Sequence, residues 1–154
     1  ISKFRKTQFP KIHLIHGNLS QQEIAAIYHH GKVKAFVSAT RGEGYGLPLI
    51  DAAVAGIPIV TTGWSGQFEF LEKDLVSCVD YKLENIPESR IDNRIFLNGF
   101  KWAQPDQKSF QKQIANVYND YAKAKTKANS LKKKVTQNFH KKVLFKRYED
   151  ILGK

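Results

Sequence analysis

The chain lacks several features that would restrict its class. Among its 154 residues there is one cysteine and no methionine. The single Cys78 excludes an intramolecular disulfide and is typical of a reducing, cytoplasmic compartment. No run of eighteen apolar residues occurs, so the sequence predicts neither a membrane-spanning helix nor a secretory leader. Because the chain starts at Ile1 and contains no methionine, we expect it to be a fragment of a longer protein.

Acidic residues are also scarce, with 14 against 25 Lys or Arg, a net charge of +11. Residues 123–154 contain eleven of the basic residues and two acids, which accounts for nine of the net charges. Such a concentration is typical of nucleic-acid or anionic membrane contacts, and also of an ordinary solvated helix. The region lacks interleaved aromatics and a known motif, which disfavours a nucleic-acid partner; peripheral docking on an anionic membrane surface stays open.

The composition fits one folded domain, since 42% of residues are hydrophobic and 12% aromatic. Strand patterns occur at residues 12–16, 35–39, 57–62 and 75–81. Helix patterns occur at 21–30, 48–55, 107–138 (one helix or two) and 139–152, and residues 82–106, which show no firm period, are expected to form a structured connection. The alternation predicts a single α/β domain over residues 1–154, a Rossmann-like, doubly wound parallel sheet that is flanked by helices and ends in long helices.

A glycine-rich loop precedes the second of these helices, with glycines at 42, 44 and 46. Glycine lets a backbone approach a ligand closely. The helix that starts near Pro48 presents free N–H groups and a positive dipole end, which favour phosphate. Glu43 and Asp51 flank this point, and carboxylates accept hydrogen bonds from sugar hydroxyls. Together these groups suggest a nucleotide-sugar site.

These residues carry a family resemblance. Glu43, seven intervening residues and Asp51 resemble the E-x(7)-E signature of GT-B glycosyltransferases, most closely the retaining, family-4-like group. The segment 65–71 is similar to the S-G-x-x-E-F-L stretch of these enzymes, and 102–106 is similar to their W-A-x-P-D element. The resemblance covers roughly residues 11–118. It departs at Asp51, where the pattern has Glu, one methylene longer.

The resemblance assigns roles to the loop residues. It implies that Glu43, as the catalytic residue, binds hydroxyls of the donor sugar and that Asp51 binds the ribose hydroxyls. The expected donor-binding set is Arg41, Gly44, Tyr45, Gly46, Leu47, Asp51, Ser65 and Gly66. Plainer interpretations stay open: Glu43 capping nearby N–H groups, Asp51 stabilising a helix N-terminus, Arg41 simply exposed, and residues 64–66 forming a turn.

The resemblance also implies an activity, transfer of a sugar from a nucleotide-sugar, with retention and without a metal or other cofactor. It implies an acceptor (a sugar, a lipid-linked or another molecule) held by an N-terminal domain that is absent here, so we expect this fragment to be inactive alone. The histidines show no metal-ligand spacing. Two alternatives remain, a non-catalytic nucleotide- or sugar-binding module and a basic nucleic-acid-binding domain.

Overall fold

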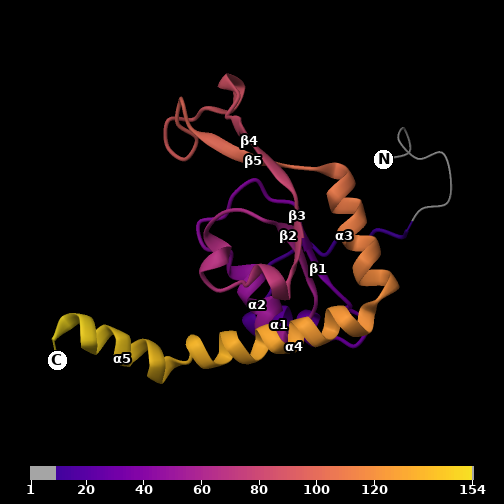
Figure 1. Ribbon diagram of the computed structural model, residues 1–154, viewed down its shortest axis with the longest axis vertical. Helices are drawn as coiled ribbons and strands as arrows, with labels where there is room; N and C mark the ends of the chain where they lie inside the picture. The colour runs from indigo at the N-terminus through magenta and orange to yellow at the C-terminus, as the bar shows by residue number, and fades with distance from the viewer. Residues whose placement is uncertain (1–9, 154) are drawn as a thin grey trace.

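A computed structural model describes residues 10–153 (Figure 1). Its centre is a parallel sheet with the strand order β1-β2-β3, in which β1 (Phe36–Ser38), β2 (Ile59–Thr62) and β3 (Ser77–Val79) are neighbours. Val37 lies opposite Val60, and Thr61 lies opposite Cys78. The β2 strand is buried along its whole length, as expected for the middle strand of a covered parallel sheet.

Helices cover both faces of this sheet. They are α1 (Gln21–His29), α2 (Leu47–Ala55), α3 (Gln107–Asn119) and α4 (Tyr121–Asn138), whereas α5 (Lys141–Leu152) follows α4 and extends away from the sheet (Figure 1). Because successive strand residues point to opposite faces, Ile59 packs into a cluster with α2 and α4, while Val60 packs into a cluster with α3. The predicted α/β class with a doubly wound sheet is therefore confirmed.

The larger core joins α2 to α4. Its buried residues include Leu49, Ala52 and Ala53 of α2 and Leu131 and Val135 of α4. The two alanines are almost completely buried, so the helices approach closely at this contact. The smaller core, on the other face, contains Val60, Val79 and Val117. The α4 helix therefore completes the core beneath the loop that opens α2.

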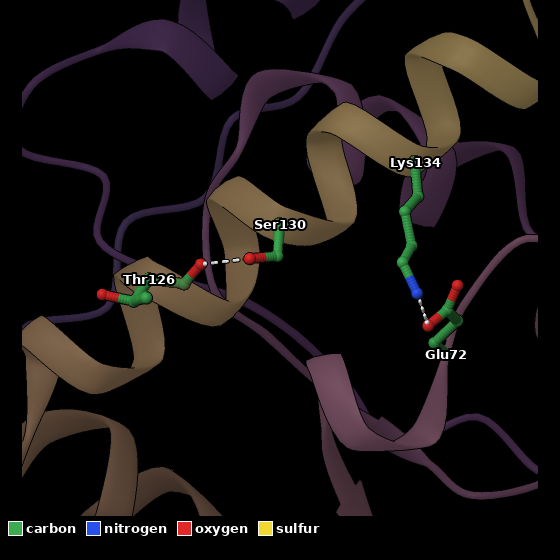
Figure 2. A network of polar contacts seen from close by, with 4 residues as sticks. All are labelled: Glu72, Thr126, Ser130 and Lys134. Atoms are coloured by element: carbon green, nitrogen blue, oxygen red, sulfur yellow. Dashed lines mark hydrogen bonds and ion pairs between the residues drawn. The ribbon is translucent and has the colours of Figure 1, made fainter.

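The Lys-rich α4 helix uses several lysines to dock. Gly56 ends α2 with φ +71°, and a Cβ there would lie 3.1 Å from Lys132 Cδ. Lys125 Nζ donates to the Gly56 carbonyl. Figure 2 shows Lys134 of α4 paired with Glu72, which lies outside that helix. Some of the lysines among residues 123–154 therefore hold α4 in place in the fold.

The long helical region divides at one residue. Asp120 is the C-cap of α3, and its carboxylate accepts the Lys123 N–H at 3.1 Å to cap the start of α4. Two other helices are capped by side chains at their first turn. Asp106 accepts the Ser109 N–H, and Ser20 and Glu23 form a reciprocal capping box at α1. In the part of the chain that the structure describes, no helix is long and apolar enough to cross a membrane.

The strand predicted at residues 12–16 is wrong. The segment has no regular structure, and its apolar residues Ile12, Leu14 and Ile15 are between 63% and 87% exposed. Its alternating pattern is that of a strand, but a strand needs a neighbour to pair its backbone groups. Within residues 10–153 no strand pairs with this segment. Local pattern was therefore insufficient at this position.

The structured connection predicted at 82–106 contains a hairpin that the sequence did not predict. There β4 (Tyr81–Asn85) pairs with β5 (Lys101–Pro105) in an antiparallel hairpin, with Leu83 opposite Ala103. It continues from the carboxyl end of β3 and extends beyond the parallel sheet (Figure 1). Because a long loop separates the two strands, their pairing could not be recognised from the sequence. The hairpin is the main addition to the predicted fold, and it borders the site described next.

Candidate functional site

The glycine loop joins the carboxyl end of β1 to the first residue of α2. Gly46 adopts the left-handed conformation, with φ +87°, and a Cβ there would lie 3.1 Å from both Gln67 Cβ and Leu49 Cδ1. Its carbonyl accepts the Leu49 and Ile50 N–H groups, at 2.9 and 3.2 Å. Among the residues that the structure describes, no side chain caps this helix start. The predicted glycine loop and helix are confirmed, and the helix N-terminus is available to a ligand.

A second loop, after β2, clamps the residue Glu43. Ser65 Oγ donates to the Glu43 carbonyl at 2.8 Å and accepts the Glu43 N–H at 3.0 Å. The Gly66 N–H donates to the same carbonyl at 3.1 Å. A Cβ on Gly66 would lie 2.0 Å from the Gly44 carbonyl oxygen, so only glycine fits this position. The structure brings Glu43, Gly44, Ser65 and Gly66 together as predicted, and the Ser65 hydroxyl is engaged by the Glu43 backbone.

The two acids of the motif are both unpaired. Among residues 10–153, neither the Glu43 nor the Asp51 carboxylate has a hydrogen-bond or ion-pair partner. Glu43 is half-buried and Asp51 is exposed. By contrast, Asp106 and Asp120 each cap a helix. The structure thus provides no local capping role for Glu43, and both carboxylates remain available to a ligand.

Glu43 and Asp51 line different hollows. Asp51 borders a small cavity of about 150 Å³ between α1 and α2, beside Tyr28 and His29. Burial and, to a smaller degree, the charge of Asp51 raise the pKa of the Tyr28 phenol. Glu43 borders a larger cleft of about 540 Å³ between the glycine loop, the loop after β2 and the hairpin. The cleft is lined by Thr40, Arg41, Gly42, Glu43, Gly44, Trp64, Ser65, Ile86, Ile95, Phe96, Phe100, Lys101 and Trp102.

Arg41 attaches the glycine loop to the hairpin. Its guanidinium carbon lies 4.3 Å from the centre of the Trp102 ring, and its carbonyl accepts the Ala103 N–H at 3.0 Å. A cation over an indole face is held by the negative electrostatic potential of the ring. Arg41 is therefore both exposed to the cleft and tied to the hairpin, and its contact with phosphate stays a prediction.

Tyr45 and Leu47 are both exposed, but only Tyr45 packs against another aromatic ring. The Tyr45 ring packs on Phe70 at 5.2 Å between centroids, and Phe70 meets Phe139 edge-on at 6.4 Å. Tyr45 therefore anchors the loop to the core. Leu47, in the first turn of α2, is 67% exposed. The contact of its backbone with a donor stays a prediction.

Sequence reasoning missed the buried polar residues beneath the two loops. Gln67 is completely buried and donates from Nε2 to the Thr62 carbonyl at 3.2 Å. Its Oε1, and the hydroxyls of Thr40, Thr61 and Thr62, have no partner within the described residues. Buried polar atoms are normally satisfied by ordered water or a ligand. The only signal for Gln67 was its position within the S-G-x-x-E-F-L stretch.

Other chemistry finds no support in the described residues. Between Pro10 and Gly153, no three His, Cys, Asp or Glu side chains gather so as to hold a metal ion. Cys78 is partly buried, and burial raises the pKa of its thiol. A thiol with a raised pKa is mostly protonated at neutral pH and is a poor nucleophile. The expectation of a reaction without a metal stays a prediction.

Comparison with known families places the chain beside a described family. The family model described as Family 4 Glycosyltransferase in conflict systems matches residues 18–143, most of the chain. The matched range includes the glycine loop, both unpaired carboxylates, the clamp at residues 65–66 and the whole hairpin. A comparison with curated proteins gave no significant match.

Proposed function

The chain belongs to the family 4 glycosyltransferases, and from this membership we propose that residues 41–66 hold a nucleotide-sugar donor whose sugar is transferred to an acceptor with retention of configuration. The observation that carries the proposal is the uncapped N-terminus of α2, placed between two carboxylates that have no partner among residues 10–153. An N-terminus suits the diphosphate, and the carboxylates suit hydroxyls on either side of it.

In this proposal Glu43 contacts the sugar. The clamp from Ser65 and Gly66 fixes its backbone, so its carboxylate needs little reorganisation when the donor arrives. A carboxylate at this point accepts hydrogen bonds from sugar hydroxyls and stabilises positive charge that develops at the anomeric carbon. Glu43 is therefore the proposed catalytic residue.

Asp51 contacts the nucleoside. It lies about one turn into α2 and borders the hollow beside α1, so it faces away from the cleft that contains Glu43. Two ribose hydroxyls are matched to the two oxygens of one carboxylate. The side chain is one methylene shorter than the glutamate of the family pattern, so the nucleoside must lie closer to α2.

The diphosphate lies between these two points. Gly44, Gly46 and the first turn of α2 supply backbone N–H groups and the positive end of the helix dipole, and Arg41 supplies a cation at the margin. As the bond from the anomeric carbon to the diphosphate oxygen breaks, these groups stabilise the departing charge without a metal ion. A bond to the acceptor oxygen forms, and the departing diphosphate takes the acceptor proton.

The acceptor would be bound jointly with a further domain outside this chain. Under this proposal the isolated chain binds a donor weakly and turns it over slowly or not at all. A chain that transferred sugar efficiently by itself would contradict this part of the proposal.

The test is ligand-observed NMR with UDP, GDP, ADP and their glucose conjugates. We expect one nucleotide to receive saturation from the protein. Asp51→Asn should weaken the binding of both the bare nucleotide and its glucose conjugate, because both carry ribose. Glu43→Gln should weaken only the binding of the conjugate, because only the conjugate carries glucose. Glu69→Gln and Asp74→Asn, at exposed acids outside both hollows, are the matched controls.

Equal binding by all four variants would overturn the assignment of the two acids. A non-catalytic binding module would give the same NMR result, but the full-length protein would then release no nucleotide diphosphate from the bound donor. That second measurement separates an enzyme from a binding module.

A further inference from the structure

The hairpin exposes aromatic and aliphatic side chains toward the same cleft as Glu43. Ile95 is 79% exposed, Phe100 60% and Phe96 36%, and all three line the cleft. Both tryptophans of the chain, Trp64 and Trp102, line it as well. Exposed apolar surface of this kind, concentrated in one hollow, is typical of a binding site.

The hairpin loop is held in shape by its own backbone contacts. The Asp92 carboxylate accepts the N–H groups of Arg94, Ile95 and Phe96, each at 2.9 Å. The Ile86 N–H donates to the Phe100 carbonyl at 3.0 Å, which closes the loop at its base. The apolar wall is therefore a built feature of the hairpin.

The rings are also fixed relative to the glycine loop. The Phe96 and Trp102 rings meet edge-on, with their centroids 5.9 Å apart. The Trp102 ring also contacts the Arg41 guanidinium of the glycine loop. Trp64 packs against Tyr81 at 5.6 Å. The same cleft presents polar groups from Thr40, Arg41, Glu43 and Lys101. The cleft thus combines aromatic and aliphatic side chains with hydrogen-bonding groups.

A pyranose ring matches this combination. Its faces carry C–H groups, which pack on aromatic rings, and its edge carries hydroxyls, which bond to carboxylates and cations. We infer that the β4–β5 hairpin is the acceptor-side subsite, which holds a pyranose ring of the acceptor against Phe100 and Trp102 beside Glu43. The inference rests on the proposed function, because it takes Glu43 as the sugar end of the donor.

The position of Asp51 decides between acceptor and nucleobase. A nucleobase would also stack on these rings. However, Asp51, the proposed ribose ligand, borders the separate hollow between α1 and α2, and none of the residues around it lines the hairpin cleft. The nucleoside therefore lies toward α1, and the hairpin cleft is left for the sugar that receives the transferred group.

The two tryptophans make a direct test possible. The chain is labelled with 5-fluorotryptophan, and the fluorine signals are assigned with Trp64→Phe and Trp102→Phe. The probes are the methyl glycosides of glucose, mannose, galactose and N-acetylglucosamine at millimolar concentration, with UDP, GDP and ADP as the second arm. The variant is Phe100→Ser, with Ile95→Ser as a second substitution in the wall. Phe145→Ser, at a phenylalanine of similar exposure on α5, is the control.

We expect at least one glycoside to shift the Trp102 signal. Phe100→Ser should weaken this binding about fivefold to tenfold, since one aromatic contact is lost, and Phe145→Ser should not change it. The inference is overturned if no glycoside shifts either signal, if Phe100→Ser and Ile95→Ser both bind like the original chain, or if only nucleotides shift the signals. If nucleotides bind in a way that depends on Asp51 and no glycoside binds, the acceptor subsite is overturned while the donor site stands. Glycoside binding without any nucleotide binding would instead contradict the donor site.

Discussion

The hydroxyl of Ser65 bridges the amide and the carbonyl of Glu43, two residues that are 22 positions apart in the chain. The contact joins the loop after β2 to the loop after β1 at the carboxyl ends of neighbouring parallel strands, which is where ligands bind in open α/β sheets. Ser65 therefore holds the backbone of Glu43 in place.

Removing the Ser65 hydroxyl should loosen Glu43 and leave the fold intact. Ser65→Ala loses two hydrogen bonds, so we expect the free energy of unfolding to fall by about 1–3 kcal/mol. Ser65 has φ +91°, so Ser65→Gly should be less destabilising than Ser65→Ala by up to about 1 kcal/mol. Urea denaturation measures both. Ser130→Ala, which removes an exposed bond within α4, is the control; an equal loss there would contradict a special role for Ser65.

The two neighbouring glycines should respond differently to a methyl group. A Cβ on Gly66 would lie 2.0 Å from the Gly44 carbonyl oxygen, so Gly66→Ala should destabilise the chain by at least about 2 kcal/mol. A Cβ on Gly44 would meet nothing within 4 Å, so Gly44→Ala should change stability by less than about 0.5 kcal/mol. If the donor approaches the Gly44 backbone, Gly44→Ala should nonetheless weaken nucleotide-sugar binding. Unchanged binding would remove Gly44 from the proposed site.

Local signals predicted the elements that depend on neighbouring residues. The capping box at Ser20, the left-handed Gly56 and the cap at Asp106 each depend on residues within a few positions of one another, so a sequence pattern can indicate them. The parallel sheet follows from alternation of short strands and helices. The fold class was therefore accessible from the sequence.

Long-range pairing was not accessible in the same way. The segment 12–16 has a strand pattern without a strand partner in the described residues, and the hairpin has partners separated by a long loop. The cleft shared by Glu43 and Phe100 depends on that hairpin, so its aromatic wall could not be predicted. The link between Ser65 and Glu43 likewise depends on the spacing of β1 and β2, which no local pattern specifies.

Acid should loosen the hairpin loop. The N–H groups of Arg94, Phe96 and Ile95 hold the pKa of the Asp92 carboxyl below its usual range. A lowered folded pKa means that the contribution of Asp92 is fully present above the unfolded value, near pH 4, and is lost as pH falls through the folded pKa. The fluorine signal of labelled Trp102 should report this loss, and Asp92→Ala should show it already at neutral pH. A pH-independent signal in the original chain would contradict the prediction.

The α4 helix should depend on its apolar residues far more than on its ion pair. The Lys134 and Glu72 side chains are 52% and 45% exposed, so Lys134→Ala should cost less than about 1 kcal/mol. Leu131 is 1% exposed in the larger core, so Leu131→Ala should cost about 2–5 kcal/mol. Thermal or urea unfolding of the two variants gives the comparison. A larger effect at Lys134 would show that the pair is shielded from solvent.

The α5 helix offers a test of membrane docking. Phe145, Tyr148, Ile151 and Leu152 are each more than half exposed on this helix, which also carries Lys and Arg. If these residues bind a membrane, the chain should float with vesicles that contain phosphatidylserine and lose this binding at high salt and in Ile151→Ser. Equal flotation with neutral vesicles, or none with either, would exclude the anionic-membrane role.

The order in which the chain leaves the ribosome has a consequence for the glycine loop. Leu131 and Val135 complete the core beneath α2, yet they follow Leu49 by some eighty residues. Contacts of such separation form late, because a long stretch of chain must be ordered first. The loop that carries Glu43 would therefore stay unsupported during synthesis until α4 emerges, and nascent chains that end before Tyr121 should be sensitive to proteases at residues 40–56.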